Sequence, residues 1–369
     1  MNRYVYKLKK LNKCFSLCVN KKSKDLQLLT NFHLITEEKM KLLPFPKSPI
    51  LLCYHNRAFP FGIIQANSPV DITKWACTKC VNCNFFSTRL NNKFNIAVHD
   101  VWGIDEGLVE HQIVSLSKDD SRISDEDLLQ DLKDAINNDY YISGIFNEKH
   151  VPNKWTYESK DFVHDFLIIG YEDDRFISVG YVSSGKFERF EIPNKNLACA
   201  LRTVPDAKIK LNLYKYNVES RPKPCIERMI DDLKKYISTT DYFYNQYPKA
   251  SLFGIAACVR LKMFFVDEIQ QGKNYVDRRY SLAFYEHKWI LSKLVELFLD
   301  PEESKQYQES VNRNLEKAKL VHLLGLKITY SRDIKLISHV IELMDEIIAD
   351  EIQYIPSLIE LLQKKYLVV

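Results

Sequence analysis

The feature of the sequence that most constrains its fold is a change of hydrophobic periodicity near residue 221. Between residues 140 and 192, apolar and β-branched residues form short runs separated by turn-forming residues, which is the pattern of strands joined by tight connections. After the Pro-rich segment 221–224, apolar residues recur at helical spacing, as in Ile226, Met229 and Leu233. The sequence therefore predicts an α+β domain followed by an all-helical domain.

The length of 369 residues also favours more than one domain. We expect a basic N-terminal extension at residues 1–39, an α+β domain at 40–220 and a helical domain at 221–369. Met40 precedes a Pro-punctuated apolar stretch that is a natural beginning for a folded domain. The sequence leaves open whether translation starts at Met1 or at Met40.

Individual elements follow from local patterns. A helix is predicted at 124–136, where Ser124 can cap the first turn and three acidic residues suit the positive end of the helix dipole. The predicted strands that follow are 140–146, 166–171, 176–181 and 186–192, of which the last three form an antiparallel meander. The predicted helices of the second domain are 226–237, 251–270, 277–299, 303–324 and 333–350, with a shorter helix after Pro356.

Composition and charge exclude several classes of protein. The formal net charge is only +4, and basic and acidic residues are interleaved, so we expect no nucleic-acid partner. No apolar run reaches the roughly 18 residues that would cross a bilayer, and no export signal is recognisable, so we expect a cytoplasmic protein without a membrane partner. The odd count of 9 cysteines then indicates reduced thiols rather than a disulfide framework.

Cys53 is the first candidate for catalysis. It lies in the run from Ile50 to Arg57, directly after the Pro-rich beginning of the first predicted domain. Cysteine is the strongest side-chain nucleophile near neutral pH when a neighbouring group lowers its pKa or accepts its proton. The alternative interpretation of an unpaired cysteine beside Leu and Tyr is a small buried hydrophobic residue.

His164 is the second candidate. It stands just before the first strand of the predicted meander, where a rigid sheet can present its imidazole to a thiol as general base and then as general acid. The alternative is a polar residue that faces water at the start of a strand. Together the two candidates follow the order of papain-like enzymes, with an early cysteine, an intervening helix and a histidine that opens a meander.

Short motifs around both candidates carry a likeness to a known family. They are Cys53–Asn56, His164–Asp173, Ser183–Phe187, Asp277–Arg279 and Glu286–Lys288. Over about residues 40 to 300, the sequence resembles the N-terminal-domain family typified by butirosin biosynthesis protein H, which is related in fold to the double-glycine cysteine peptidases. The resemblance implies a papain-like α+β fold with an antiparallel meander, followed by an all-α helical domain.

The resemblance also implies an acyltransferase or amide-forming enzyme of natural-product (peptide or polyketide) biosynthesis. In that scheme Cys53 takes an acyl group from a carrier-protein thioester, His164 moves the proton, and an amine resolves the intermediate. The expected partners are an acyl carrier protein or carrier-bound thioester and an amine acceptor, with a homodimer as a further assembly. We expect no cofactor and no metal.

Two other functions stay open at this point. A cysteine peptidase or thioesterase acting on a biosynthetic peptide would use the same dyad with water as the acceptor. A catalytically silent member of the family would bind a peptide or carrier. This alternative is favoured because residues that a papain-like enzyme needs are missing from their expected positions. No acid occupies the expected position of the residue that orients the histidine, where Gly180 and Tyr181 stand, and Asp165 should point away from His164. Pro60 should interrupt a helix that begins at Cys53.

A cluster of three cysteines could bind a metal, because tight turns present thiolates to one ion. It consists of Cys77, Cys80 and Cys83, with His99 and His111 downstream. A second pair of ligands at suitable spacing does not follow, so we interpret the cluster as chance and predict no metal there. The cysteines at 199, 225 and 258 are expected in the core.

The mixed charges of Asp277–Arg279 and Glu286–Lys288 have two interpretations. Ion pairs that brace the two domains are the simpler one. The alternative is that Arg278 and Arg279 bind an acidic carrier surface or its phosphate.

Overall fold

The computed structural model describes residues 40–87, 92–98, 100–117, 124–206, 208–239, 251–272 and 277–367. It divides the chain into two compact units, Met1–Lys39 and Met40–Val369. The predicted basic extension lies outside the described residues. All that follows concerns the second unit.

The larger sheet confirms the α+β class and the predicted meander. Its strands are β1 (Met40–Leu42), β4 (Val109–Ser117), β5 (Tyr141–Asn147), β6 (Val163–Glu172), β7 (Arg175–Tyr181), β8 (Phe187–Pro193) and β9 (Lys208–Tyr216). They follow the order β4-β9-β5-β6-β7-β8, β1 pairs with β6, and every pairing is antiparallel. The sequence analysis missed β1, β4 and β9, although Ile209, Leu211 and Leu213 of β9 alternate with polar residues.

The helices that contact this sheet include the following two. The first, α4 (Asp125–Asn137), begins where the sequence predicts, because Ser124 accepts a hydrogen bond from the N–H of Asp127 and forms a capping box with it. Its buried residues Leu128, Leu132 and Ile136 form one face. The second, α5 (Asn194–Arg202), follows β8 directly and contacts β5 and β8.

A smaller sheet joins segments that are distant in the sequence. It contains β2 (Asn82–Ser87), β3 (Asn92–Ala97) and β10 (Ser251–Phe253), in the antiparallel order β10-β2-β3. Together with α3 (Thr73–Lys79) it contacts the helices of the C-terminal region. The elements α3, β2 and β3, which precede most of the larger sheet, therefore pack with helices that follow it.

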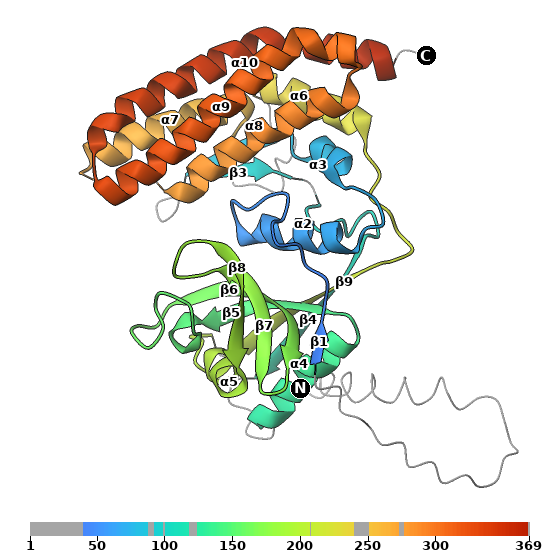
Figure 1. The fold of residues 1–369 in the computed structure, drawn as a ribbon, viewed down its shortest axis with the longest axis vertical. Helices are drawn as coiled ribbons and strands as arrows, with labels where there is room; N and C mark the ends of the chain where they lie inside the picture. Colours follow the sequence, from blue (N-terminus) through green and yellow to red (C-terminus); the bar gives the residue numbers. More distant parts are fainter. Residues whose placement is uncertain are drawn as a thin grey trace, which may run out of the picture. The chain divides into compact units, whose positions relative to one another are not determined.

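The C-terminal region is mainly helical, as the sequence predicts, but residues 251–253 form β10 instead of the beginning of the predicted helix 251–270. Its elements are α6 (Ile226–Ser238), α7 (Gly254–Gln270), α8 (Arg278–Phe298), α9 (Pro301–Ser331), the short η2 (Ile334–Leu336) and α10 (Ile337–Tyr366). The last three α-helices lie side by side, with α9 between α8 and α10 (Figure 1). Within the described ranges, no helix is both long and apolar enough to cross a membrane.

Both prolines that were expected to break helices lie inside helices instead. Helix α2 (His55–Asn67) contains Pro60, which has no N–H to donate to the carbonyl of Asn56. The Nη1 of Arg57 donates to that carbonyl at 3.2 Å, so the lost bond is replaced. Similarly, α10 continues through Pro356, and the residue four positions earlier, Ile352, is exposed to water.

A buried ion pair connects α8 to α10. The Nζ of Lys288 lies 2.8 Å from the Oε2 of Glu351, and both side chains are almost completely buried. The hydroxyl of Tyr236 on α6 donates to the same oxygen at 2.6 Å and accepts from Lys288 at 2.9 Å. These contacts join α6, α8 and α10 through one oxygen of Glu351, while its Oε1 has no hydrogen-bond partner among the described residues.

We predict that Glu351→Leu lowers the free energy of unfolding by about 3 to 5 kcal/mol, because it leaves the Lys288 ammonium buried without a counter-charge. Denaturation with urea measures this loss. The double variant Lys288→Met/Glu351→Leu removes both charges and should recover most of the stability. Lys305→Ala, which breaks an exposed pair with Glu302, should cost less than about 1 kcal/mol. A double variant as unstable as the single one would contradict the prediction.

Candidate functional site

A cavity of about 280 Å³ brings both predicted catalytic residues together. Cys53 lies two residues before the first residue of α2, and His164 is the second residue of β6. The residues that line the cavity are Cys53, Tyr54, His55, Asn56, Asn92, Lys93, His164, Asp165, Tyr181, Arg279 and Tyr280. The wall thus combines a thiol, two imidazoles, a carboxylate and two cations from five separate parts of the chain.

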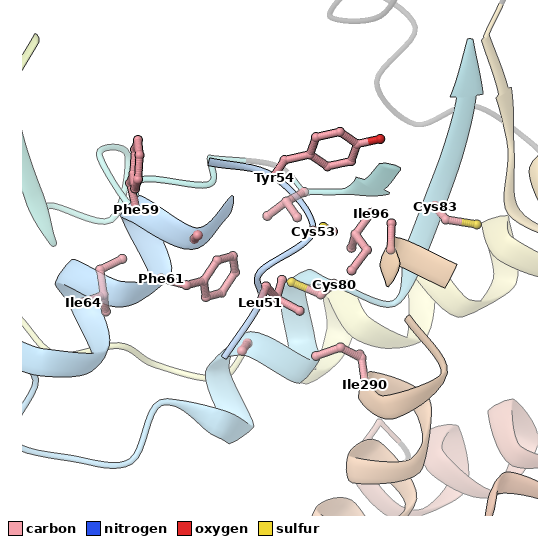
Figure 2. Close-up of a cluster of buried hydrophobic side chains, with 14 of the residues drawn as sticks. Leu51, Cys53, Tyr54, Phe59, Phe61, Ile64, Cys80, Cys83, Ile96 and Ile290 are labelled. Atoms are coloured by element: carbon pink, nitrogen blue, oxygen red, sulfur yellow. The ribbon is translucent and has the colours of Figure 1, made fainter. Parts of the chain in front are cut away.

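Cys53 is held in a segment without regular secondary structure. Its side chain belongs to the buried cluster of Leu51, Ile96 and Cys80 (Figure 2), and in this conformation the residue has no exposed surface. Burial, and then the nearby carboxylate of Glu286, raises the pKa of the Cys53 thiol well above its usual value. At neutral pH the thiol is therefore protonated, and a base must remove its proton before it can attack.

The carboxylate of Glu286 fixes the backbone of this segment. Its two oxygens accept hydrogen bonds from the N–H of Leu52 at 2.6 Å and from the N–H of Cys53 at 3.1 Å. The carbonyl of Leu52 accepts from the hydroxyl of Tyr181 on β7, and the hydroxyl of Tyr54 donates to the carbonyl of Phe94 on β3 at 2.7 Å. Helix α8 and both sheets thus position the candidate nucleophile.

The sequence suggested that Glu286 belongs to a group of ion pairs between two domains, whereas in the structure its carboxyl group accepts backbone hydrogen bonds from Leu52 and Cys53. Burial raises the pKa of its carboxyl to about 7, although the two backbone N–H groups partly oppose the shift. The neighbouring positions are buried as well, and the Nε2 of His287 lies 2.9 Å from the carbonyl of Val81. Three consecutive charged or polar residues in the middle of an apolar helix were the available signal.

His164 lies between two carboxylates. Its Nδ1 is 3.6 Å from the Oε1 of Glu148, which lies in the short helix η1 (Glu148–His150), and 3.7 Å from the Oδ1 of Asp165. The expectation that Asp165 points away from His164 is therefore wrong. Although burial opposes it, the hydrogen bond from His55, followed by the nearby imidazole of His164, holds the pKa of Asp165 below its usual value, so this carboxylate stays ionised.

The position that was expected to orient His164 contacts a different histidine. The N–H of Tyr181 donates to the Nε2 of His55 at 3.2 Å, and Gly180 leaves room for that ring. The Nδ1 of His55 lies 2.9 Å from the Oδ1 of Asp165. A backbone N–H can only donate, so Nε2 accepts and the proton of the neutral ring is on Nδ1, facing the carboxylate. Burial lowers the pKa of His55, which keeps it neutral.

The tautomer of His55 argues against a metal ion bound by His55, His164 and Asp165. The ligand atoms of His55, His164 and Asp165 lie within 4.8 Å of one another, a spacing that could hold an ion. A metal at the Nδ1 of His55 would require its lone pair there and a proton on Nε2, which would face the N–H of Tyr181. Nearby, the ammonium of buried Lys154 already lies 3.1 Å from Glu148. The arrangement suits proton transfer better than cation binding.

The cysteines of the predicted cluster point to different neighbours. The Sγ of Cys83 lies 3.7 Å from the Sγ of Cys258, while the thiol of Cys77 faces the carbonyl of Ile290 at 3.8 Å. Cys80 is buried in the core shown in Figure 2. His111 is exposed and bonds to Asn212, and His99 lies outside the described residues. The expectation that 199, 225 and 258 are core residues is wrong for exposed Cys225; Cys199 is half-buried, and Cys258 is buried.

The two arginines of the Asp277–Arg279 motif differ in environment. Arg279 lines the cavity and pairs with Asp277, with its Nε 3.0 Å from one carboxylate oxygen. Arg278 donates to the carbonyl of Gly185 at 2.9 Å and lies over the ring of Tyr181. Arg278 therefore joins α8 to the turn that follows β7.

No model of a known protein family matches the sequence, and no curated protein shows significant similarity to it.

We predict that the ionisation of Glu286 lowers the free energy of unfolding as the pH rises. Its folded-state pKa of about 7 lies above the ordinary carboxyl value, so its contribution is present below pH 4.5 and is lost as the pH passes 7. From pH 5 to 8 the loss should be roughly 3 kcal/mol. Urea denaturation across this range measures it, and Glu286→Gln, which cannot titrate, is the control. Equal pH slopes in both proteins would refute the prediction.

Proposed function

We propose that the chain is a cysteine-dependent acyltransferase, in which Cys53 is the nucleophile and His164 the general base. The observation that carries this proposal is the shared cavity: residues 111 positions apart in the sequence line the same space of about 280 Å³. Ionised carboxylates beside His164 would stabilise the imidazolium that forms when it takes the thiol proton.

The likeness of the motifs to the butirosin biosynthesis protein H family supports a more specific proposal. A cysteine shortly before a helix and a histidine at the start of a meander suit a papain-like arrangement. We therefore propose an acyl donor that is a carrier-protein thioester and an acceptor that is an amine, as expected for an amide-forming step of natural-product biosynthesis.

The chemistry requires two transfers. The sulfur of Cys53 attacks the donor carbonyl while His164 takes the thiol proton. The departing carrier thiolate then receives that proton from His164. The amine then attacks the thioester on Cys53 and loses a proton to His164. The amide forms as the sulfur of Cys53 leaves and takes that proton from His164. With water in place of the amine, the same groups would give a thioesterase or peptidase.

A second candidate function is binding without catalysis. The observation that favours it is the state of Cys53, whose N–H is occupied by Glu286 and whose protonated thiol is buried. Attack would require the side chain to turn into the cavity. A protein that only holds a peptide or carrier would not need this movement.

We predict that a short-chain acyl thioester of N-acetylcysteamine acylates the protein on Cys53 and that Cys53→Ala abolishes the adduct. His164→Ala should slow acylation about 10²- to 10⁴-fold, because the thiol loses its base. Intact-mass spectrometry with peptide mapping measures both effects. Cys225→Ala, at an exposed thiol outside the cavity, is the matched control.

Adding an amine to the acylated protein should release an amide, which distinguishes transfer from hydrolysis. An unmodified Cys53 after exposure to donors of several chain lengths would favour the binding function instead. Acylation that proceeds equally in wild type and His164→Ala would remove His164 from the mechanism.

A further inference from the structure

One cation of the cavity wall, Lys93, forms no ion pair with the residues that the structure describes. Lys93 is on β3, is half-buried, and lines the cavity with Cys53 and His164. Its Nζ lies 4.4 Å from the centre of the Tyr54 ring, and among the described residues no carboxylate pairs with it. The other cation of the wall, Arg279, is neutralised by Asp277.

Keeping Lys93 in this position costs free energy. Burial lowers the pKa of the Lys93 ammonium, and the nearby charge of Arg57 lowers it further. A negative charge on Cys53 would raise this pKa. An ammonium taken partly out of water without an ion pair is unfavourable, and the face of Tyr54 returns only part of the loss. A charge held at such a cost next to a candidate nucleophile indicates a functional role.

The site also lacks a usual source of transition-state stabilisation. When a thiol attacks a carbonyl, the backbone N–H of the nucleophile commonly binds the oxygen that becomes negative. Here the N–H of Cys53 is already bonded to Glu286 at 3.1 Å. The hydroxyl of Tyr54 is likewise used, because it donates to Phe94. The charged donor that remains in the wall is Lys93.

We propose that Lys93 is a catalytic residue that stabilises the oxyanion formed when Cys53 attacks a carbonyl. In this step the sulfur–carbon bond forms, the carbonyl π electrons move to oxygen beside the Lys93 ammonium, and the thiol proton moves to His164. The carbonyl then re-forms, the donor thiolate leaves and takes the proton from His164. The inference rests on the acyl-transfer function proposed above.

The test compares two alkylating reagents of similar size, neutral iodoacetamide and anionic iodoacetate, each of which places a carbonyl next to the sulfur of Cys53 and releases iodide. In wild type, Lys93 should favour the anion. In Lys93→Met the ratio of iodoacetate to iodoacetamide rates at Cys53 should fall roughly tenfold, because one nearby charge is lost. Lys93→Arg should retain the ratio, and Lys195→Met, at an exposed position on α5, should leave it unchanged.

A second measurement separates catalysis from structure. Thermal unfolding of Lys93→Met should occur at the same temperature as in wild type or higher, since an unpaired charge is removed, while acylation of Cys53 by the thioester should slow at least tenfold. A lower unfolding temperature would show that Lys93 stabilises the fold and would count against the proposal.

The outcomes distinguish this inference from the proposed function. Equal reagent ratios, or equal acylation rates, in wild type and Lys93→Met would overturn the role of Lys93 and leave Cys53 as the nucleophile. A Cys53 that neither reagent modifies in the folded wild-type protein would overturn both proposals.

Discussion

The hydrogen bonds from Leu52 and Cys53 to the carboxylate of Glu286 are the interaction on which the site depends. Residues 50–54 cross the interior without a strand or helix, so their N–H groups would be unsatisfied unless another element supplied acceptors. The two carboxyl oxygens of Glu286 accept one bond each, which a side chain with a single acceptor atom could not do. The C-terminal helices are thus part of the site rather than an addition to it.

Charge within the site is arranged so that neighbouring groups hold different protonation states. Asp165 stays ionised between two imidazoles, His55 stays neutral because burial and the Tyr181 N–H determine its tautomer, and the thiol of Cys53 keeps its proton. His164 has the most exposed imidazole of the group and is the one with two carboxylates nearby. This separation of states is the physical basis for assigning the base role to His164 rather than to His55.

The sequence predicted the elements with strong periodicity and missed what depends on contacts. The helix at Ser124, the meander and the C-terminal helices were predictable because capping and apolar spacing are local. Pro60 was misjudged because the donor that replaces its N–H is the side chain of Arg57. Cys53 and His164 could be named from residue type and order, but the partners Glu148, Asp165 and Glu286 depend on distances that no spacing reveals.

The distance in sequence between Cys53 and Glu286 has a consequence for how the chain matures on the ribosome. The hydrogen bonds that order the nucleophile segment span 233 and 234 positions. A nascent chain that ends before residue 286 has therefore completed the larger sheet but cannot satisfy the N–H groups of Leu52 and Cys53. Truncated translation products that end before residue 286 would therefore carry Cys53 without the acceptor that orders its backbone.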